Sequence, residues 1–205
     1  MRNKLVFENK RDHIIRVIHA AAMDIRIWTE ANAQNDMALQ RVSRLAPETI
    51  HDVLPHEAQL YCIVDASWKS PSEKIGIGWF LFSKESTLKL QGSSAMDATG
   101  TPLVAEAVAM WKALCQLHRL HYKNVAFLGD RLKLIHQLEC AMEDKQHMEN
   151  HISEASSTIH DIKVIAKENL YSFYHVPHIF TNVVDSLAKN VRTNNQSYVI
   201  SWPCY

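Results

Sequence analysis

The pattern of apolar and polar positions divides the chain into a helical N-terminal segment and a longer part of mixed structure. Between residues 12 and 35, apolar residues recur at spacings of three and four, which predicts an amphipathic helix. Such a helix can dock on the rest of the protein or bind a partner protein. Residues 36–58 lack this periodicity and contain two prolines, so we expect an N-terminal helix and a linker at residues 1–58.

The rest of the chain alternates between strand and helix patterns. Apolar or alternating runs predict strands at residues 60–66, 75–82, 88–94, 124–128 and 170–175. Helical periodicity predicts helices at residues 101–120, 130–142, 150–168 and 182–192. This order, βββαβααβα, is typical of an α/β fold in which helices flank a mixed sheet. We therefore expect one α/β domain at residues 59–195 and a C-terminal tail at residues 196–205.

Composition and charge narrow the class of protein. Of the 205 residues, 47% are hydrophobic and 21% are charged, which is typical of a globular domain with an appendage. The net formal charge is zero, which gives little support to a nucleic-acid partner, because strong binders usually carry a basic excess. A local basic patch is compatible with overall neutrality.

Neither a membrane span nor an export signal is visible in the sequence. No apolar run approaches the roughly 18 residues of a membrane span. The first ten residues are charged and lack the apolar core of a signal peptide. The four cysteines show no metal-ligand spacing among themselves. We expect an intracellular protein that does not enter the membrane.

Asp65 is the most informative acidic residue, because it ends an apolar run. Residues 60–64 show no alternation, which is typical of a strand that is buried on both faces. A buried carboxylate without a partner costs on the order of several kcal/mol. No Lys or Arg stands close before Lys69. We therefore expect a divalent cation beside Asp65.

Three further acids stand inside or beside apolar elements. Glu106 lies on the inward face of its helix, Asp130 follows an apolar strand, and Asp185 borders the apolar stripe of the last helix. Each has an ordinary alternative role, because the helix dipole favours acids in the first turns and an aspartate can cap a helix. Asp130 also stands where the carboxyl ends of strands border the ligand crevice in α/β sheets.

Four carboxylates on separate elements fit a site for two metal ions. Two Mg²⁺ ions about 3.5–4 Å apart can activate a water molecule and stabilise the leaving oxygen of a phosphodiester. Oxygen ligands without a Cys/His cluster suit Mg²⁺ or Mn²⁺ better than zinc. The pattern favours a metal-dependent nuclease.

The motifs around these acids resemble the ribonuclease H family, in particular the ribonuclease H-like domains of plant non-LTR retroelements. The resemblance covers about residues 58–195. Its motifs are Val64-Asp-Ala-Ser-Trp-Lys69 with Gly76-Ile-Gly-Trp79, Pro102-Leu-Val-Ala-Glu-Ala107, Leu128-Gly-Asp130, and His175-Val-Pro177 followed by Asn182-Val-Val-Asp-Ser-Leu-Ala-Lys189. It implies a five-stranded mixed sheet whose second strand is antiparallel. It also implies endonucleolytic cleavage of the RNA strand in RNA/DNA hybrids.

The resemblance also assigns roles to individual residues. It implies that two Mg²⁺ ions, which Mn²⁺ can replace, are held by four ligands: Asp65, Glu106, Asp130 and Asp185. His175 matches the family's mobile histidine, which helps the product leave or relays protons, and His178 is a neighbour that could substitute for it. The groove for the hybrid is expected to be lined by Ser67, Trp68, Thr101 and Arg131.

Two observations favour an alternative without useful catalysis. The segment 139–149 carries four acids against Lys145, where bacterial relatives carry a basic protrusion that grips the substrate. Together with zero net charge, this favours a domesticated domain that binds nucleic acid or protein. A proofreading-type exonuclease is disfavoured, because it would carry a second acid two residues after Asp65, where this chain has Ser67.

Overall fold

The computed structural model of the protein describes residues 49–143 and 154–203. The helix expected at residues 12–35 and the first residues of the helix expected at 150–168 lie outside these ranges. Within the described residues, no helix is both long and apolar enough to cross a membrane.

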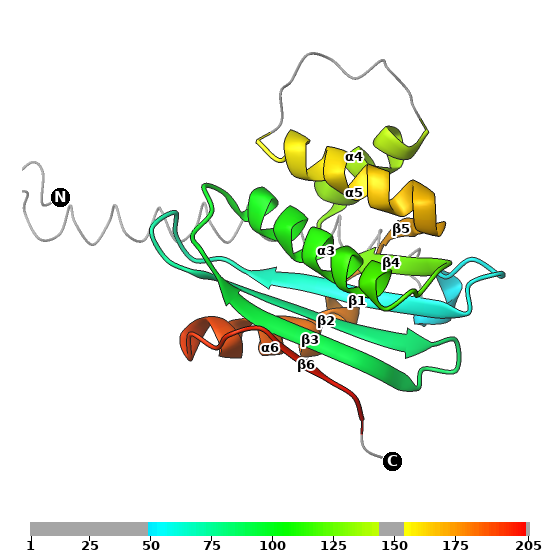
Figure 1. The fold of residues 1–205 in the computed structure, drawn as a ribbon, viewed down its shortest axis with the longest axis horizontal. Helices are drawn as coiled ribbons and strands as arrows, with labels where there is room; N and C mark the ends of the chain where they lie inside the picture. The colour runs from blue at the N-terminus through cyan, green and yellow to red at the C-terminus, as the bar shows by residue number, and fades with distance from the viewer. Residues whose placement is uncertain (1–48, 144–153, 204–205) are drawn as a thin grey trace, which may run out of the picture. The chain divides into compact units, whose positions relative to one another are not determined.

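Six strands form one mixed sheet (Figure 1). Their bounds are β1 Leu60–Ser67, β2 Ile75–Ser83, β3 Leu88–Met96, β4 Val125–Gly129, β5 Ser172–His175 and β6 Val199–Ser201. The strands lie side by side in the order β5-β4-β1-β2-β3-β6. β4 is parallel to β1 and β5 is parallel to β4, whereas β2, β3 and β6 are antiparallel to the strands they join. The carboxyl ends of β1, β4 and β5 therefore meet at one edge of the sheet.

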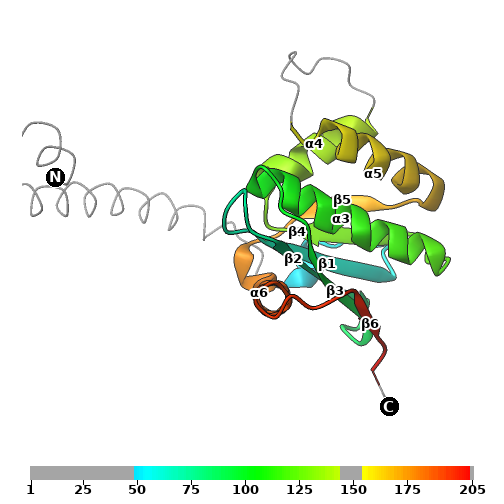
Figure 2. The same ribbon diagram turned by 60° about the vertical axis from the view of Figure 1, so that its left-hand side comes forward.

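Helices cover both faces of this sheet. Their bounds are α3 Pro102–Arg119, α4 Leu132–Met142, α5 Ser156–Asn169 and α6 Asn182–Thr193, with short 3₁₀ turns η1 at Ile50–Asp52 and η2 at His178–Phe180. In Figures 1 and 2, α3, α4 and α5 lie on one face and α6 lies on the other. The expected α/β fold, a mixed sheet flanked by helices, is confirmed.

The core consists of two apolar clusters, one on each face. Along β1, Cys62 and Val64 belong to the larger cluster under α3, α4 and α5, whereas Tyr61 and Ile63 belong to the smaller cluster, which includes Val184 of α6. Successive residues of β1 therefore meet apolar partners on both sides. This is why the run carries no polar alternation.

Two glycines of β2 allow α6 to lie directly on the sheet. A Cβ atom added at Gly76 would stand 1.9 Å from the backbone oxygen of Ala188, and one at Gly78 would stand 3.0 Å from that of Val184. Because these two helix residues flank Asp185, the close approach also fixes the height of Asp185 above the sheet.

The structure adds a strand that the sequence analysis places in a tail. Five strands are expected, but Val199–Ser201 forms a sixth, which pairs with Gln91–Ser93 of β3. Three residues are too few to show a period, and their partner is distant in sequence. Part of the expected linker is also packed, because Ile50, Val53 and Leu54 contact the smaller cluster.

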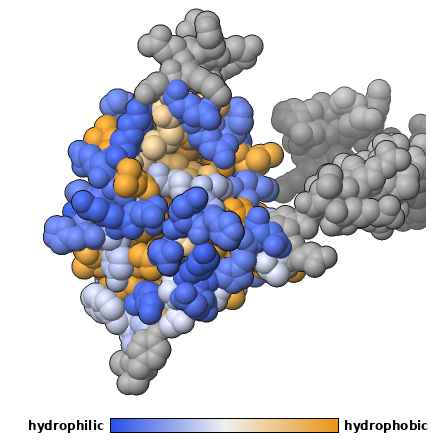
Figure 3. Space-filling view, turned by 90° about the vertical axis from the view of Figure 1, so that its right-hand side faces the viewer, coloured by the Kyte–Doolittle hydropathy of each residue, from blue (hydrophilic) through white to orange (hydrophobic). Residues whose placement is uncertain are grey.

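The surface shown in Figure 3 is mainly hydrophilic, with apolar side chains in scattered patches. Among the described residues, the most exposed large apolar side chains stand on separate elements: Leu132, Leu170, Ile179 and Val183. Scattered exposure of this kind is ordinary for a globular protein.

Candidate active site

Asp65 and Asp130 lie beside each other at the edge where the parallel strands end. β1 and β4 pair with Ile63 opposite Leu128, so each aspartate stands two residues beyond the same pair. Asp130 follows directly after the last residue of β4. The parallel pairing thus brings together two carboxylates that are far apart in sequence.

Glu106 and Asp185 come from helices on opposite faces of the sheet. Glu106 lies in the second turn of α3, behind Thr101, whose hydroxyl caps the helix. Asp185 lies in the first turn of α6. The charges of Asp65 and Asp130 act on Glu106, and that of Asp185 acts on Asp65. The four carboxylates therefore form one electrostatic cluster.

Asp65 is only 4% exposed. Its Oδ1 accepts a hydrogen bond of 2.7 Å from the backbone N–H of Ala66, whereas its Oδ2 is buried and has no hydrogen-bond partner among the described residues. Burial, followed by the charge of Asp130, raises the pKa of Asp65 to about 7. A buried carboxylate oxygen without a donor is what a bound cation would satisfy.

Glu106 is also a buried carboxyl group with a raised pKa. It is 9% exposed, and burial raises its pKa well above the ordinary value, with further increases from the charges of Asp65 and Asp130. The nearby Arg131 guanidinium opposes this shift. Neighbouring carboxyl groups with raised pKa values indicate a site that is short of positive charge.

Asp130 is held by two side chains of the segment before α6. His178 Nδ1 lies 2.5 Å from Asp130 Oδ2, and the Thr181 hydroxyl donates to the same oxygen at 3.2 Å. His175 Nε2 donates to the backbone oxygen of Asp130 at 3.1 Å. Asp130 is not a helix cap, because the cap residue of α4 is Arg131, which makes no side-chain cap bond. Of the two histidines, His178 contacts the carboxylate.

Two cationic residues of α6 contact Asp185 and the nearby Ser67. Lys189 Nζ lies 2.5 Å from Asp185 Oδ2, one turn along the helix. Arg192 Nε donates to Ser67 Oγ at 3.0 Å, and Ser67 is only 5% exposed. Contact of Ser67 with nucleic acid stays a prediction.

The other residues predicted to contact nucleic acid have structural partners or exposed positions. Trp68 Nε1 donates to the backbone oxygen of Thr99 at 2.9 Å, and the Thr101 hydroxyl accepts from the N–H of Val104. Arg131 is exposed next to Asp130. Their contacts with a nucleic acid also stay predictions.

The residues at this edge fit a divalent cation. Asp65, Asp130 and His178 each offer one ligand atom, and these atoms lie within 4.8 Å of one another. Carboxylate oxygens suit Mg²⁺ and Mn²⁺, and imidazole suits the transition metals. Glu106 and Asp185 are the two further carboxylates that could complete the coordination.

Comparison with known proteins identifies the domain that carries this cluster. The family model described as reverse transcriptase-like matches residues 63–191, more than half of the chain. The chain belongs to the reverse transcriptase-like family. The matched range of this reverse transcriptase-like domain includes all four carboxylates. No curated protein matches the chain.

Several solved structures share the fold of the reverse transcriptase-like domain. RNase H1 from the halophilic archaeon Halobacterium salinarum NRC-1 is 20% identical with a TM-score of 0.53, covering 66% of this chain and 98% of that one. LC11-RNase H1, isolated from compost, was solved in complex with an RNA/DNA hybrid; it is 18% identical with a TM-score of 0.56, covering 66% and 97%. The foamy viral protease-reverse transcriptase in complex with an RNA/DNA hybrid is 18% identical with a TM-score of 0.57, covering 73% and 22%. The fold is ribonuclease H-like.

Lys189 and Thr181 are not among the predicted site residues, and His178 is predicted only as a substitute for His175. Lys189 could have been found, because it stands four residues after Asp185 on the same helix. Thr181 and His178 carry no comparable signal, since they reach Asp130 across 51 and 48 positions. Only the fold brings them together.

Proposed function

We propose that this reverse transcriptase-like domain is a metal-dependent endonuclease that hydrolyses the RNA strand of RNA/DNA hybrids. The observation that carries the proposal is the buried Asp65 Oδ2, which lacks a hydrogen-bond partner among the described residues, in a cluster with Asp130 and His178. The ribonuclease H-like fold supports the reaction class. The hybrids bound by LC11-RNase H1 and by the foamy viral enzyme support the substrate class.

The four carboxylates hold the metal in this proposal. Asp65, Glu106, Asp130 and Asp185 are the ligands of two Mg²⁺ ions, which Mn²⁺ can replace. When bound, the ions would activate a water molecule and stabilise charge at the phosphodiester. The protein supplies rigid placement, because two ligands come from paired strands and two from helices packed on that sheet.

The histidines provide proton transfer. Imidazole is suited to accept and release protons near neutral pH. His175 is the proposed mobile histidine, and its ring donates a hydrogen bond to the backbone oxygen of Asp130. His178 orients the Asp130 carboxylate and is the second candidate for the proton relay.

The groove residues provide recognition of the RNA strand. Ser67, Trp68, Thr101 and Arg131 are proposed to contact the hybrid, with hydrogen bonds to 2′-hydroxyl groups distinguishing RNA from DNA. The sequence motifs further support an origin in a plant-type non-LTR retroelement.

A binding module without catalysis is the second candidate, and a specific observation favours it. Lys189 already pairs with Asp185, and His178 already pairs with Asp130, so Asp185 has a cationic partner from the protein itself and Asp130 has one that is cationic when its imidazole is protonated. With zero net charge overall, such a domain could bind nucleic acid or protein without using a metal.

Cleavage of a labelled hybrid tests the proposal. The full chain is incubated with an RNA/DNA hybrid labelled on each strand, in Mg²⁺, Mn²⁺ or EDTA, beside Asp65→Asn and the exposed control Asp97→Asn. Metal-dependent cutting of the RNA strand alone, absent in Asp65→Asn and unchanged in Asp97→Asn, is expected. No cutting by the folded wild type at low salt with either metal would support the binding module.

A further inference from the structure

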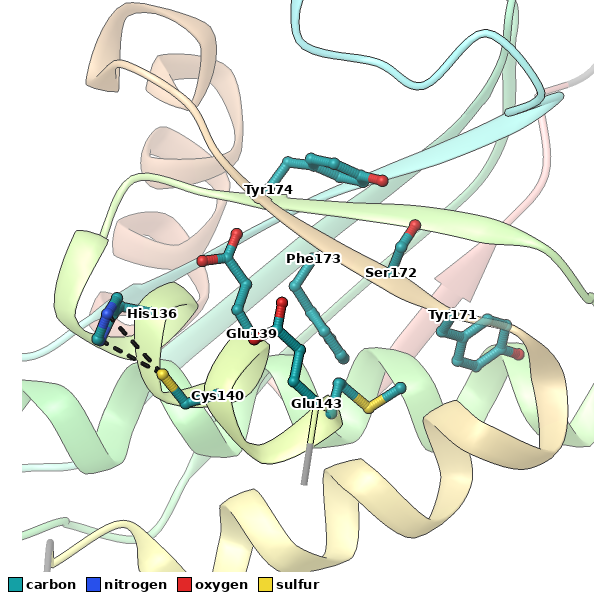
Figure 4. Close-up of a pocket in the computed structure, with 9 residues that line it drawn as sticks. His136, Glu139, Cys140, Glu143, Tyr171, Ser172, Phe173 and Tyr174 are labelled. Carbon is teal, nitrogen blue, oxygen red and sulfur yellow. Dashed lines mark hydrogen bonds between the residues drawn. The ribbon is translucent and has the colours of Figure 1, made fainter. Parts of the chain in front are cut away.

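Thr181 is a fully buried polar residue at the end of the segment that joins β5 to α6. Figure 4 shows Phe173 and Tyr174 on opposite sides of β5, and each packs against one of the two apolar clusters. The strand that precedes the segment is therefore anchored on both faces. Thr181 itself is 0% exposed, so its hydroxyl must find its partners inside the protein.

The hydroxyl of Thr181 does not serve the helix that it precedes. Thr181 is the N-cap residue of α6, a position where a threonine side chain ordinarily accepts a hydrogen bond from the backbone of the first turn. Here the backbone of Thr181 has helical angles (φ −97°, ψ −8°), and its side chain makes no cap bond. Instead, Oγ1 lies 3.2 Å from Asp130 Oδ2, 3.1 Å from His178 Nδ1 and 3.1 Å from the backbone oxygen of His178.

The single proton of this hydroxyl can be donated to Asp130 or to the backbone oxygen of His178. That backbone oxygen already accepts a hydrogen bond of 3.0 Å from the backbone N–H of Thr181. A hydrogen bond to an ionised carboxylate is about twice as strong as one between neutral groups. When Asp130 is ionised, as a metal ligand must be, the proton is therefore donated to Asp130.

The main chain of Thr181 contacts a second acidic residue. Its carbonyl oxygen accepts a hydrogen bond of 2.9 Å from the backbone N–H of Asp185. Thr181 thus contacts two of the four proposed metal ligands, Asp130 through its side chain and Asp185 through its main chain. Because Thr181 and His178 both bind Oδ2 of Asp130, they hold the carboxylate from one side and use only one of its two oxygens.

We infer that Thr181 is a positioning residue for the metal site. Its hydroxyl orients the Asp130 carboxylate, and its main chain holds Asp185 at a fixed place relative to Asp130. Hydrogen bonds that orient a ligating carboxylate typically change metal affinity or activity by about 10–100-fold. This inference rests on the metal site of the proposed function, but not on the cleavage of hybrids.

Three substitutions separate positioning from a purely structural role. Thr181→Val keeps the shape of the side chain and removes the hydroxyl, and no helix cap is lost with it. Thr181→Ser keeps the hydroxyl and removes a buried methyl group. Thr193→Val is the control, because the Thr193 hydroxyl donates to the backbone oxygen of Lys189 in the last turn of the same helix.

Calorimetric titration of the full chain with Mn²⁺ measures the affinity of each variant, and Asp65→Asn identifies the binding that belongs to the acidic cluster. We expect Thr181→Val to bind Mn²⁺ about tenfold more weakly than the wild type, whereas Thr181→Ser and Thr193→Val stay within about twofold. Circular dichroism confirms that each variant is folded. Denaturant unfolding without metal should rank the variants differently, with Thr181→Ser less stable than the wild type because the lost methyl group leaves a cavity.

Wild-type Mn²⁺ affinity in Thr181→Val would overturn the inference, since the hydroxyl would then bind His178 for stability alone. Equal weakening in Thr181→Ser would also overturn it, because the loss would follow packing rather than the hydroxyl. Absence of Asp65-dependent Mn²⁺ binding in the folded wild type would overturn both this inference and the proposed function. If Mn²⁺ binds with the expected affinities but no hybrid is cut, the nuclease proposal fails and the role of Thr181 is supported.

Discussion

At the scale of single residues, Asp65 combines burial with a carboxylate oxygen that lacks a hydrogen-bond donor among the described residues. This combination lowers the stability of a folded protein. Without a cation, the protein lowers this cost by keeping the carboxyl protonated, which is what a pKa raised to about 7 means. Proton and metal ion therefore compete for the same oxygen.

The stability of the metal-free protein is expected to fall as pH rises. The pKa of Asp65 is about 7 in the folded state against 3.8 as the ordinary value. The group therefore contributes its full stabilisation below about pH 4, and this is lost as pH rises through about 7, a change on the order of a few kcal/mol. Thermal unfolding in EDTA should show a falling Tm for the wild type and a flatter profile for Asp65→Asn. Parallel profiles for the two proteins would contradict this assignment.

The two histidines are expected to differ in their effect on metal binding. Hydrogen bonding to Asp130 raises the pKa of His178, so at mildly acidic pH the imidazolium occupies the carboxylate that the metal needs. His178→Ala should therefore bind Mn²⁺ several-fold more tightly than the wild type at about pH 6, with little difference at about pH 8. Calorimetric titration measures the Mn²⁺ affinity of both proteins at both pH values.

His175→Ala is the matched control for this experiment, because the His175 ring bonds to the backbone oxygen of Asp130 and not to its carboxylate. It should leave the Mn²⁺ affinity near that of the wild type at both pH values. Weaker binding by His178→Ala at both pH values would instead show that His178 is itself a metal ligand.

At the scale of elements, the sequence predicts what depends on neighbours along the chain. The unbroken apolar run of β1 and the Thr101-Pro102 start of α3 are both found as expected, because burial on two faces and helix capping are local in origin. The strand β6 is not predicted, because its three residues become a strand only through pairing with β3.

The candidate site shows the same difference between features of local origin and features that depend on residues distant in sequence. Each carboxylate stands out in sequence because it lies inside or beside an apolar pattern. Their partners do not, since Thr181 and His178 reach Asp130 only through the packing of the segment before α6. Likewise, Ser67 is a polar residue of the first motif, but its hydroxyl accepts a hydrogen bond from Arg192, which is 125 positions away in the sequence.

The packing of α6 on β2 provides a prediction at this scale. Gly76→Ala places a Cβ atom 1.9 Å from the oxygen of Ala188, so the helix must move away from the sheet and carry Asp185 with it. We expect a loss of about 1–3 kcal/mol in unfolding free energy, together with weaker metal binding. Denaturant unfolding and Mn²⁺ titration measure these effects.

Gly100→Ala is the control for this substitution, since its Cβ atom meets nothing within 4 Å. It should change the unfolding free energy by less than about 0.5 kcal/mol. Equal effects at both glycines would show that close contact with α6 is not the cause.

At the scale of the whole molecule, the distribution of charge determines how strongly the protein can bind a polyanion such as nucleic acid. The chain carries 22 basic and 22 acidic residues, and four of its acids gather at one edge of the sheet. Without a cation, this edge repels phosphate. In the proposed function, hybrid binding and metal binding are therefore expected to be coupled, because each lowers the electrostatic cost of the other.

This coupling predicts weak, salt-sensitive binding that depends on metal. The full chain is titrated into a fluorescent hybrid whose 2′-hydroxyl groups are intact, and anisotropy is read against salt before cleavage products form. With few phosphate contacts, the slope of log K against log salt should lie at about −2 to −4, with Kd at micromolar or weaker near physiological salt. Mg²⁺ should tighten binding about tenfold over EDTA, and Asp65→Asn should lose most of that gain. Tight binding in EDTA, equal for both proteins, would mean that the acidic edge does not face the substrate, and would favour a binding surface elsewhere on the domain.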